Sequence, residues 1–143
     1  MDIKFNQSTI KISSRLFVVL KQAVKRQAIN DEVTQITFNY RDTSYSSETG
    51  GYHPVEIALQ KYQSGDHWNI LYITDFSYHG HPYAELCKDL DFDFSAESFS
   101  GVYAPPRPLN HRSVKEIFKL WQDNFLSYLE YGAFDEIEVN VCE

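Results

Sequence analysis

Hydrophobic and polar residues alternate along much of the chain, and this pattern predicts β-strands. Residues 33–41 alternate regularly, which is typical of a strand with one buried face. Residues 52–62 and 67–78 continue the pattern, and Ser64-Gly65-Asp66 between them predicts the turn of a hairpin. The second of these strands has apolar residues on both faces. It is therefore predicted to be central and covered on both sides.

Two other segments have the periodicity of amphipathic helices. Residues 14–29 place apolar side chains on one helical face and follow serines that can cap the helix. A second helix is predicted to begin with a capping box formed by Ser113 and Glu116, and to end at Gly132. A last alternating segment, residues 134–142, predicts an edge strand with an acidic outer face.

The remaining segments carry weaker signals. Residues 83–89 predict a short helical turn, residues 91–94 a short strand, and the proline-rich residues 100–110 an extended connector. The polar residues 42–51 predict a long loop, and the sequence does not decide whether it is ordered. The element order predicts a single α+β domain over residues 1–143. Its core would be a mainly antiparallel sheet of four to five strands with two helices packed on one face.

Composition supports a folded, acidic protein. Hydrophobic residues make up 43% of the chain and aromatic residues 15%, which is enough for a packed core. Lys and Arg number 13 against 20 Asp and Glu, so the net charge is −7. Residues 1–30 are the basic exception, with six basic side chains and one acidic. The balance argues against nucleic acid as the main ligand, and favours a charged protein partner or self-association through the first helix.

The cysteines and the hydropathy indicate the compartment. Cys87 and Cys142 fit no zinc or redox spacing, and no signal peptide is visible. No stretch is long and apolar enough to span a bilayer. These features predict a cytoplasmic protein with reduced thiols and no membrane association.

Two carboxylates on the predicted hairpin form one candidate site. If the turn sets a regular register, Glu56 lies on the same face as Asp75, with Arg41 close enough to join them. Two neighbouring carboxylates raise each other's affinity for protons, which can serve acid–base chemistry or metal binding. The alternative, which the pattern favours, is an ion network that fixes the strand register.

Histidines cluster near the same end of the hairpin. His53, His79 and His81 lie on or beside the loops, with Glu85 close in sequence. Zinc needs three or four ligands with tetrahedral reach, and the spacing matches no metal motif. The other interpretation is exposed loop histidines and one hydrogen-bonded His53. No metal, cofactor or catalytic residue is therefore predicted.

Three blocks resemble a known family. They are Gly50-Gly51-Tyr52-His53-Pro54-Val55-Glu56-Ile57, Tyr72-Ile73-Thr74-Asp75-Phe76-Ser77-Tyr78 and Glu85-Leu86-Cys87-Lys88-Asp89-Leu90-Asp91-Phe92. They are similar to a small uncharacterised family of bacterial proteins, domain of unknown function 2787, over nearly the whole chain. The resemblance implies a single-domain cytoplasmic protein, and it brings no activity, cofactor or catalytic residue.

The sequence leads to one functional hypothesis and one alternative. The hypothesis is a non-enzymatic binding or interaction module that uses the loops around residues 42–53 and 76–85, because exposed Tyr and charged residues make good interface anchors. The alternative is a small hydrolase or metal-dependent enzyme with a site of Glu56, Asp75 and His53 or His79. The candidate binding residues are Tyr52, His53, Glu56, Asp75, Tyr78 and His79.

Overall fold

The computed structural model describes residues 2–62 and 66–143, so Ser64 and Gly65 of the predicted hairpin turn lie outside the described part. The helices are α1 (Ser14–Lys25) and α2 (Arg112–Glu130). The strands are β1 (Lys4–Phe5), β2 (Gln35–Arg41), β3 (Val55–Lys61), β4 (His67–His79), β5 (Glu85–Asp93), β6 (Ser98–Gly101), β7 (Ala104–Pro108) and β8 (Glu136–Cys142).

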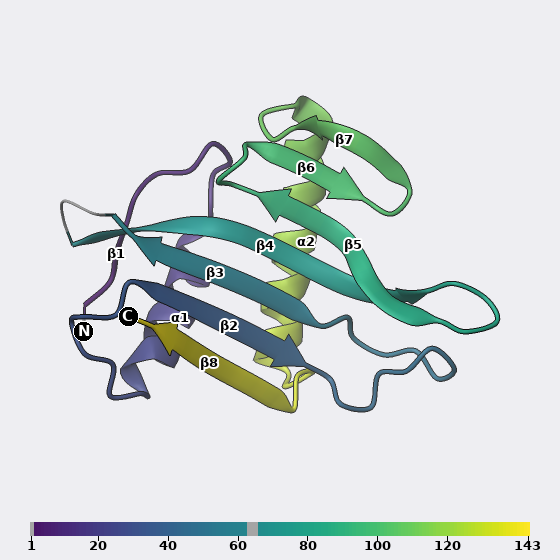
Figure 1. The fold of residues 1–143 in the computed structure, drawn as a ribbon, viewed down its shortest axis with the longest axis horizontal. Helices are drawn as coiled ribbons and strands as arrows, with labels where there is room; N and C mark the ends of the chain where they lie inside the picture. Colours follow the sequence, from purple (N-terminus) through teal and green to yellow (C-terminus); the bar gives the residue numbers. More distant parts are fainter. Residues whose placement is uncertain (1, 63–65) are drawn as a thin grey trace.

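The strands form one sheet in the order β7-β6-β5-β4-β3-β2-β8, and all neighbours along this path are antiparallel (Figure 1). The short β1 pairs in parallel with the start of β4. The described sheet thus has eight strands, and the prediction of four to five is wrong. The α+β organisation holds overall.

Apart from the short β1, the missed strands lie in the segment that follows β4. The helical turn predicted over residues 83–89 and the connector predicted over residues 100–110 are both wrong. Leu86 and Leu90 have helical spacing, but β4 is 13 residues long and offers hydrogen-bonding partners that β5 takes up. β7 accommodates its prolines because it is an edge strand, where a missing amide donor leaves no partner unsatisfied.

Both helices lie on one face of the sheet, behind the strands as drawn in Figure 1. We call this the helix-covered face and the other the uncovered face. β4 is central but covered on one side, so the prediction of cover on both sides is wrong. Neither described helix combines the length and the hydropathy that crossing a bilayer requires.

The helix ends differ from the predicted ones in detail. The hydroxyl of Ser13 accepts a hydrogen bond from the first turn of α1, as a serine cap does, and this helix ends at Lys25. α2 is capped by His111, whose Nδ1 accepts from the Ser113 amide. Ser113 therefore lies inside the helix, and the predicted capping box is wrong. Gly132, at φ +71°, follows the C-terminal end of α2.

An aromatic layer joins α2 to the centre of the sheet. The ring of Phe92 on β5 is fully buried, and its centroid lies 5.0 Å from those of Phe99 and Phe118 and 6.2 Å from that of Trp121. Such rings bury large apolar areas, and edge-to-face contacts add to the gain. This layer fixes α2 against the sheet and forms the floor beside the candidate site.

A β-bulge shifts the register within the β3–β4 hairpin. Leu59 pairs with Ile70, but Ala58 pairs with Tyr72, so Leu71 is an extra residue in β4. The regular register expected from the turn holds only on the turn side of this point. Beyond it, every pairing is displaced by one residue, which moves side chains to the opposite face.

The shift separates the two carboxylates of the predicted pair. Val55 pairs with Asp75, and Glu56 pairs with Thr74. Because paired residues point to the same face, Asp75 joins buried Val55 on the helix-covered face, whereas Glu56 lies on the uncovered face. The prediction that Glu56 and Asp75 share a face is wrong.

Candidate functional site

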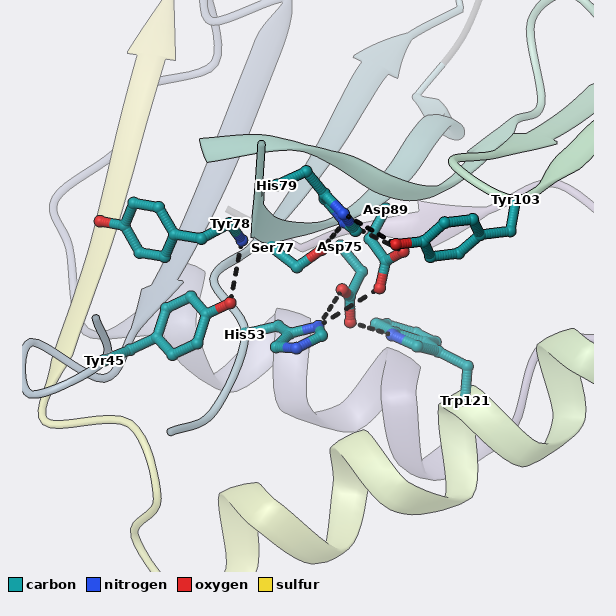
Figure 2. Close-up of polar contacts among 9 residues, drawn as sticks. All are labelled: Tyr45, His53, Asp75, Ser77, Tyr78, His79, Asp89, Tyr103 and Trp121. Carbon is teal, nitrogen blue, oxygen red and sulfur yellow. Dashed lines mark hydrogen bonds and ion pairs between the residues drawn. The ribbon is translucent and has the colours of Figure 1, made fainter. Parts of the chain in front are cut away.

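A cluster of polar side chains lies where β3, β4 and β5 meet α2, on the helix-covered face (Figure 2). Val55, Asp75 and Leu90 are paired across the three strands and form one row facing the helix. Trp121 reaches the row from the opposite side, on α2. The cluster is thus held between two rigid elements, which suits a preorganised site.

Asp75 is the centre of the cluster. It is 9% exposed, and both of its oxygens are engaged. Its Oδ1 lies 2.7 Å from Nδ1 of His53, and its Oδ2 accepts a hydrogen bond from the indole N–H of Trp121 at 3.1 Å. A buried carboxylate needs such partners to stay ionised. The two bonds also tie the sheet to α2.

His53 is held by a loop that precedes β3. The amide of its neighbour Tyr52 donates to Asp42, and the His53 ring lies 5.4 Å from the ring of Tyr45. The hydrogen bond to Asp75 raises the pKa of His53, against partial burial, and the charges of Asp75 and Asp89 add to the rise. Two carboxylates beside Nδ1 require that atom to carry a proton. The other ring nitrogen, Nε2, forms no hydrogen bond to the described residues.

A second bulge brings Asp89 into the cluster. Asp75 pairs with Leu90, but Phe76 pairs with Lys88, so Asp89 is the extra residue of β5. As a result both Asp89 and Leu90 border the pocket, where regular alternation would send one of them to the uncovered face. Oδ2 of Asp89 lies 3.6 Å from Nδ1 of His53.

His79 and Ser77 extend the cluster along β4. Nε2 of His79 lies 2.5 Å from the Ser77 hydroxyl and 3.8 Å from Oδ1 of Asp89. Nδ1 of His79 lies 3.4 Å from the hydroxyl of Tyr103, which comes from the turn between β6 and β7. Asp89 and Ser77 both lie beside the same nitrogen of His79, so this group does not have the geometry of a nucleophilic triad.

The cluster borders one end of a pocket between α2 and the sheet, which we call the α2 pocket. Its volume is about 320 Å³, at the lower end of the range for small-molecule sites. Its walls are mainly apolar and aromatic. Those on α2 include Ile117, Leu120, Trp121, Phe125 and Tyr128.

Three donor groups in the cluster could hold a metal ion. One ligand atom each of His53, Asp75 and Asp89 lies within 4.8 Å of the other two. A nitrogen and two carboxylate oxygens suit a zinc- or manganese-type ion. His53 and Asp75 are already bonded to each other, so an ion there would have to displace the proton that they share.

The six candidate residues from the sequence fall into two groups. Tyr52, His53 and Asp75 line the α2 pocket, and His79 lies beside it. Glu56 and Tyr78 instead line a hollow on the uncovered face. Figure 2 shows Tyr78 pointing away from the cluster, with its amide donating to the Tyr45 hydroxyl.

Sequence reasoning missed three residues of the site. Asp89 was hidden within a predicted helical turn, and Tyr103 within a predicted connector. Trp121 lies on the apolar stripe of the second helix and reads as core. Its one available signal is chemical, because a buried indole N–H needs an acceptor, and a carboxylate in an apolar strand needs a donor.

The comparisons with known proteins identify the family and no function. The family described as "Protein of unknown function (DUF2787)" matches residues 14–140. A hypothetical protein from the VSP-II pathogenicity island of Vibrio cholerae is 36% identical, with a TM-score of 0.90, over 99% of this chain and 100% of that one. No curated protein matches.

A second solved structure is similar over most of its length. It is a conserved hypothetical protein from pathogenicity island VPI-2 of Vibrio cholerae, 37% identical, with a TM-score of 0.84, over 95% of this chain and 99% of that one. That protein is described as sharing structural homology with the human P32 protein. The family resemblance seen in the sequence is confirmed, and neither relative is described with an enzymatic activity.

Proposed function

The chain belongs to the DUF2787 family, whose description assigns no function, and we propose that it is a non-enzymatic binding module for another protein. The contact surface is the α2 pocket with the loops around residues 42–53 and 76–85 at its rim. Free thiols at Cys87 and Cys142 support a cytoplasmic location for this module.

The observation that carries the proposal is an exposed tyrosine at the polar end of the site, beside a preformed pocket. Tyr103 is 87% exposed, and its ring lies against His79, whose Nε2 is 3.8 Å from Asp89 at the pocket. Tyrosine is a frequent anchor of interfaces, because it offers a large apolar ring and a hydroxyl at low entropic cost. Such an anchor beside a pocket suits a protein partner.

The net charge indicates a partner with a basic surface. The chain carries a net charge of −7, so a second copy would bring like charges together. A basic segment would instead be drawn towards the carboxylates of the site. The proposed partner is a different protein, and self-association through the basic residues 1–30 is the alternative that the experiment distinguishes.

Site-specific photo-crosslinking in the native host tests this proposal. A benzoylphenylalanine at position 103 is expected to capture a partner, whereas the same group at Tyr62 is not. Tyr62 is a matched control because it is also exposed, at 57%, but follows the opposite end of β3. The captured protein is then purified, and its affinity for the wild type, Tyr103→Ala and Tyr62→Ala is measured by calorimetry.

We expect Tyr103→Ala to weaken binding about tenfold or more, as for an interface anchor, and Tyr62→Ala to leave it unchanged. Equal capture from both positions would contradict the proposal. So would a purified partner whose affinity is the same for the wild type and Tyr103→Ala. An adduct of twice the mass of the chain would show self-association and reject a heterologous partner.

One observation favours an enzyme as the second candidate. Asp75 fixes the Nδ1 proton of His53 and leaves Nε2 free, which is the orientation of a general base that activates water. Glu56 has no part in such a site, because it lies on the other face. Hydrolysis of p-nitrophenyl acetate that is abolished by His53→Gln but unaffected by Glu56→Gln would favour this enzyme over the binding module.

A further inference from the structure

We propose that the α2 pocket binds a primary ammonium group at the end of an aliphatic chain, in the complex a lysine side chain of the partner. The assignment to lysine rests on the proposed function, whereas ammonium binding does not. The inference comes from the charges, the missing hydrogen-bond donors and the shape of the pocket.

The charged side chains of the pocket are predominantly acidic. Asp75 and Asp89 both border it, and among its described lining residues no Lys or Arg offsets them. His53 is the one lining group that can carry positive charge, and it lies beside both carboxylates. Two carboxylates that share one imidazole retain negative charge, which favours a cationic ligand.

Asp89 is the carboxylate that lacks a donor. Its oxygens lie 3.6 Å from His53 and 3.8 Å from His79, and both distances exceed hydrogen-bonding range. No other described residue donates to its side chain, although that side chain is only 24% exposed. A partly exposed carboxylate without donors from its own protein takes them from solvent, and an ammonium group would supply them instead.

The engaged oxygens of Asp75 exclude a guanidinium fork at that carboxylate, and oxygens of Asp75 and Asp89 lie within 4.8 Å of each other, close enough for one compact cation to contact both. A guanidinium binds best when its planar fork meets both oxygens of one carboxylate. Both oxygens of Asp75 already accept hydrogen bonds, one from His53 and one from Trp121. An ammonium is a compact charge that needs no fork, so it can lie between Asp75 and Asp89.

The walls suit the aliphatic part of the ligand. Ile117 and Leu120 provide apolar surface, and Trp121 and Tyr128 provide aromatic rings along the same pocket. A lysine side chain buries its methylene stem against such surface, and its charge interacts favourably with aromatic faces. The volume of about 320 Å³ accommodates one such chain.

Three ligands with the same six-carbon body test the head group. Hexylamine, n-hexanol and hexanoate are titrated into the full chain, and binding is followed by the NMR resonance of the Trp121 indole N–H. This N–H donates a hydrogen bond to Asp75, and Trp121 lines the pocket. Hexylamine is expected to shift it and to bind about tenfold or more tightly than n-hexanol, the gain of a charged hydrogen bond. Hexanoate is expected to bind weakest.

Variants then locate the charge. Asp89→Asn keeps the shape of the side chain and is expected to lower the affinity for hexylamine about tenfold, with little effect on n-hexanol. Glu56→Gln on the uncovered face is the matched control and is expected to change neither. Thermal melts test whether both variants fold. If Asp89→Asn does not fold, the comparison of the three ligands on the wild type still decides the inference.

Several outcomes would overturn the inference. Equal affinities for hexylamine and n-hexanol would show a purely apolar pocket, and no shift at millimolar hexylamine would show no ammonium site. Zinc chloride that shifts the same resonance at micromolar concentration would identify a metal site at His53, Asp75 and Asp89. If any of these is found while crosslinking from position 103 still identifies a partner, the lysine inference fails and the proposed function stands.

Discussion

The two faces of the sheet carry similar polar residues near the β3–β4 pairing but use them differently. On the uncovered face, charges of both signs lie close together: Lys88 is 3.9 Å from Asp91, and Arg41 pairs with Glu136 across neighbouring strands. On the helix-covered face, two carboxylates border an apolar pocket with one histidine between them.

The hydrogen bonds differ in the same way. On the uncovered face, Tyr72 donates to Glu56 and Thr74 donates to Asp91, so both of these carboxylates have a donor from a neighbouring strand. On the helix-covered face, Asp75 accepts two hydrogen bonds, whereas the side chain of Asp89 accepts none from the described residues. The difference teaches that hydrogen-bond donors, more than the number of charged groups, distinguish the two faces.

The largest expected contrast concerns packing. Phe92→Ala removes a fully buried ring from the helix-covered layer and is expected to lower the free energy of unfolding by about 3–5 kcal/mol. Phe76→Ala, on the uncovered face of the adjacent strand, removes a half-buried ring and is expected to cost about half as much or less. Urea denaturation measures both, and equal losses would contradict the one-sided core.

The next contrast concerns the carboxylates. Asp75→Asn removes the charge of the carboxylate that is hydrogen-bonded to His53 and Trp121. It is expected to lower the free energy of unfolding by about 1–3 kcal/mol. It should also lower the pKa of His53 towards its ordinary value, because the bond to Asp75 is the largest cause of the rise. NMR titration of the imidazole protons measures this. Glu56→Gln should leave the His53 titration unchanged, and a matching shift in both variants would reject the separation of the faces.

A smaller effect is expected from the loop that supports His53. Gly51 has φ +142°, and a Cβ there would lie 2.8 Å from Asp42 Oδ2 and 3.0 Å from Tyr45 Cα. Gly50 also has positive φ, but its position is open. Gly51→Ala is therefore expected to cost about 1–2 kcal/mol more than Gly50→Ala, by thermal denaturation. It should also shift the His53 resonances, which Gly50→Ala should leave in place.

The smallest effect is the pH dependence of stability. His53 has a raised pKa in the folded protein, so its stabilising contribution is complete below the unfolded value of about 6.5 and is lost as pH rises through the folded pKa. The melting temperature should therefore fall across this range at constant ionic strength. Hydrogen bonds lower the pKa of Asp42 and Asp135, so the contribution of those groups to the pH dependence of stability falls at more acidic pH. Asp75→Asn should flatten the slope, and an unchanged slope would exclude the His53–Asp75 pair as its source.

Periodicity could predict the main elements of the fold. The stripe of the second helix, the alternation of residues 33–41 and the last strand all have their counterparts in α2, β2 and β8. Each is a local pattern that one buried face imposes. The strands after β4 were less visible, because short apolar spacings in β5 fit a helix as well as a strand, and only pairing with the long β4 decides between them.

The composition of the site could be predicted only in part, because two bulges decide which side chains meet. Leu71 is apolar and fits either face, so nothing local marks it as the extra residue that separates Glu56 from Asp75. Asp89 likewise looks like one of several surface acids until the second bulge directs it to Asp75. The density of Tyr and His did point to the end of the hairpin where Tyr52, His53, Asp75 and His79 lie close together.

The scattered origin of the pocket has a consequence for how the protein becomes competent to bind. His53, Asp75, Asp89 and Trp121 come from four separate segments, and the Asp75–Trp121 bond spans 46 positions of the chain. Closing such distances is slow, because the loop entropy is lost before the contacts form. No isolated hairpin or helix of this chain can hold the site, so binding competence should emerge with the final cooperative step of folding.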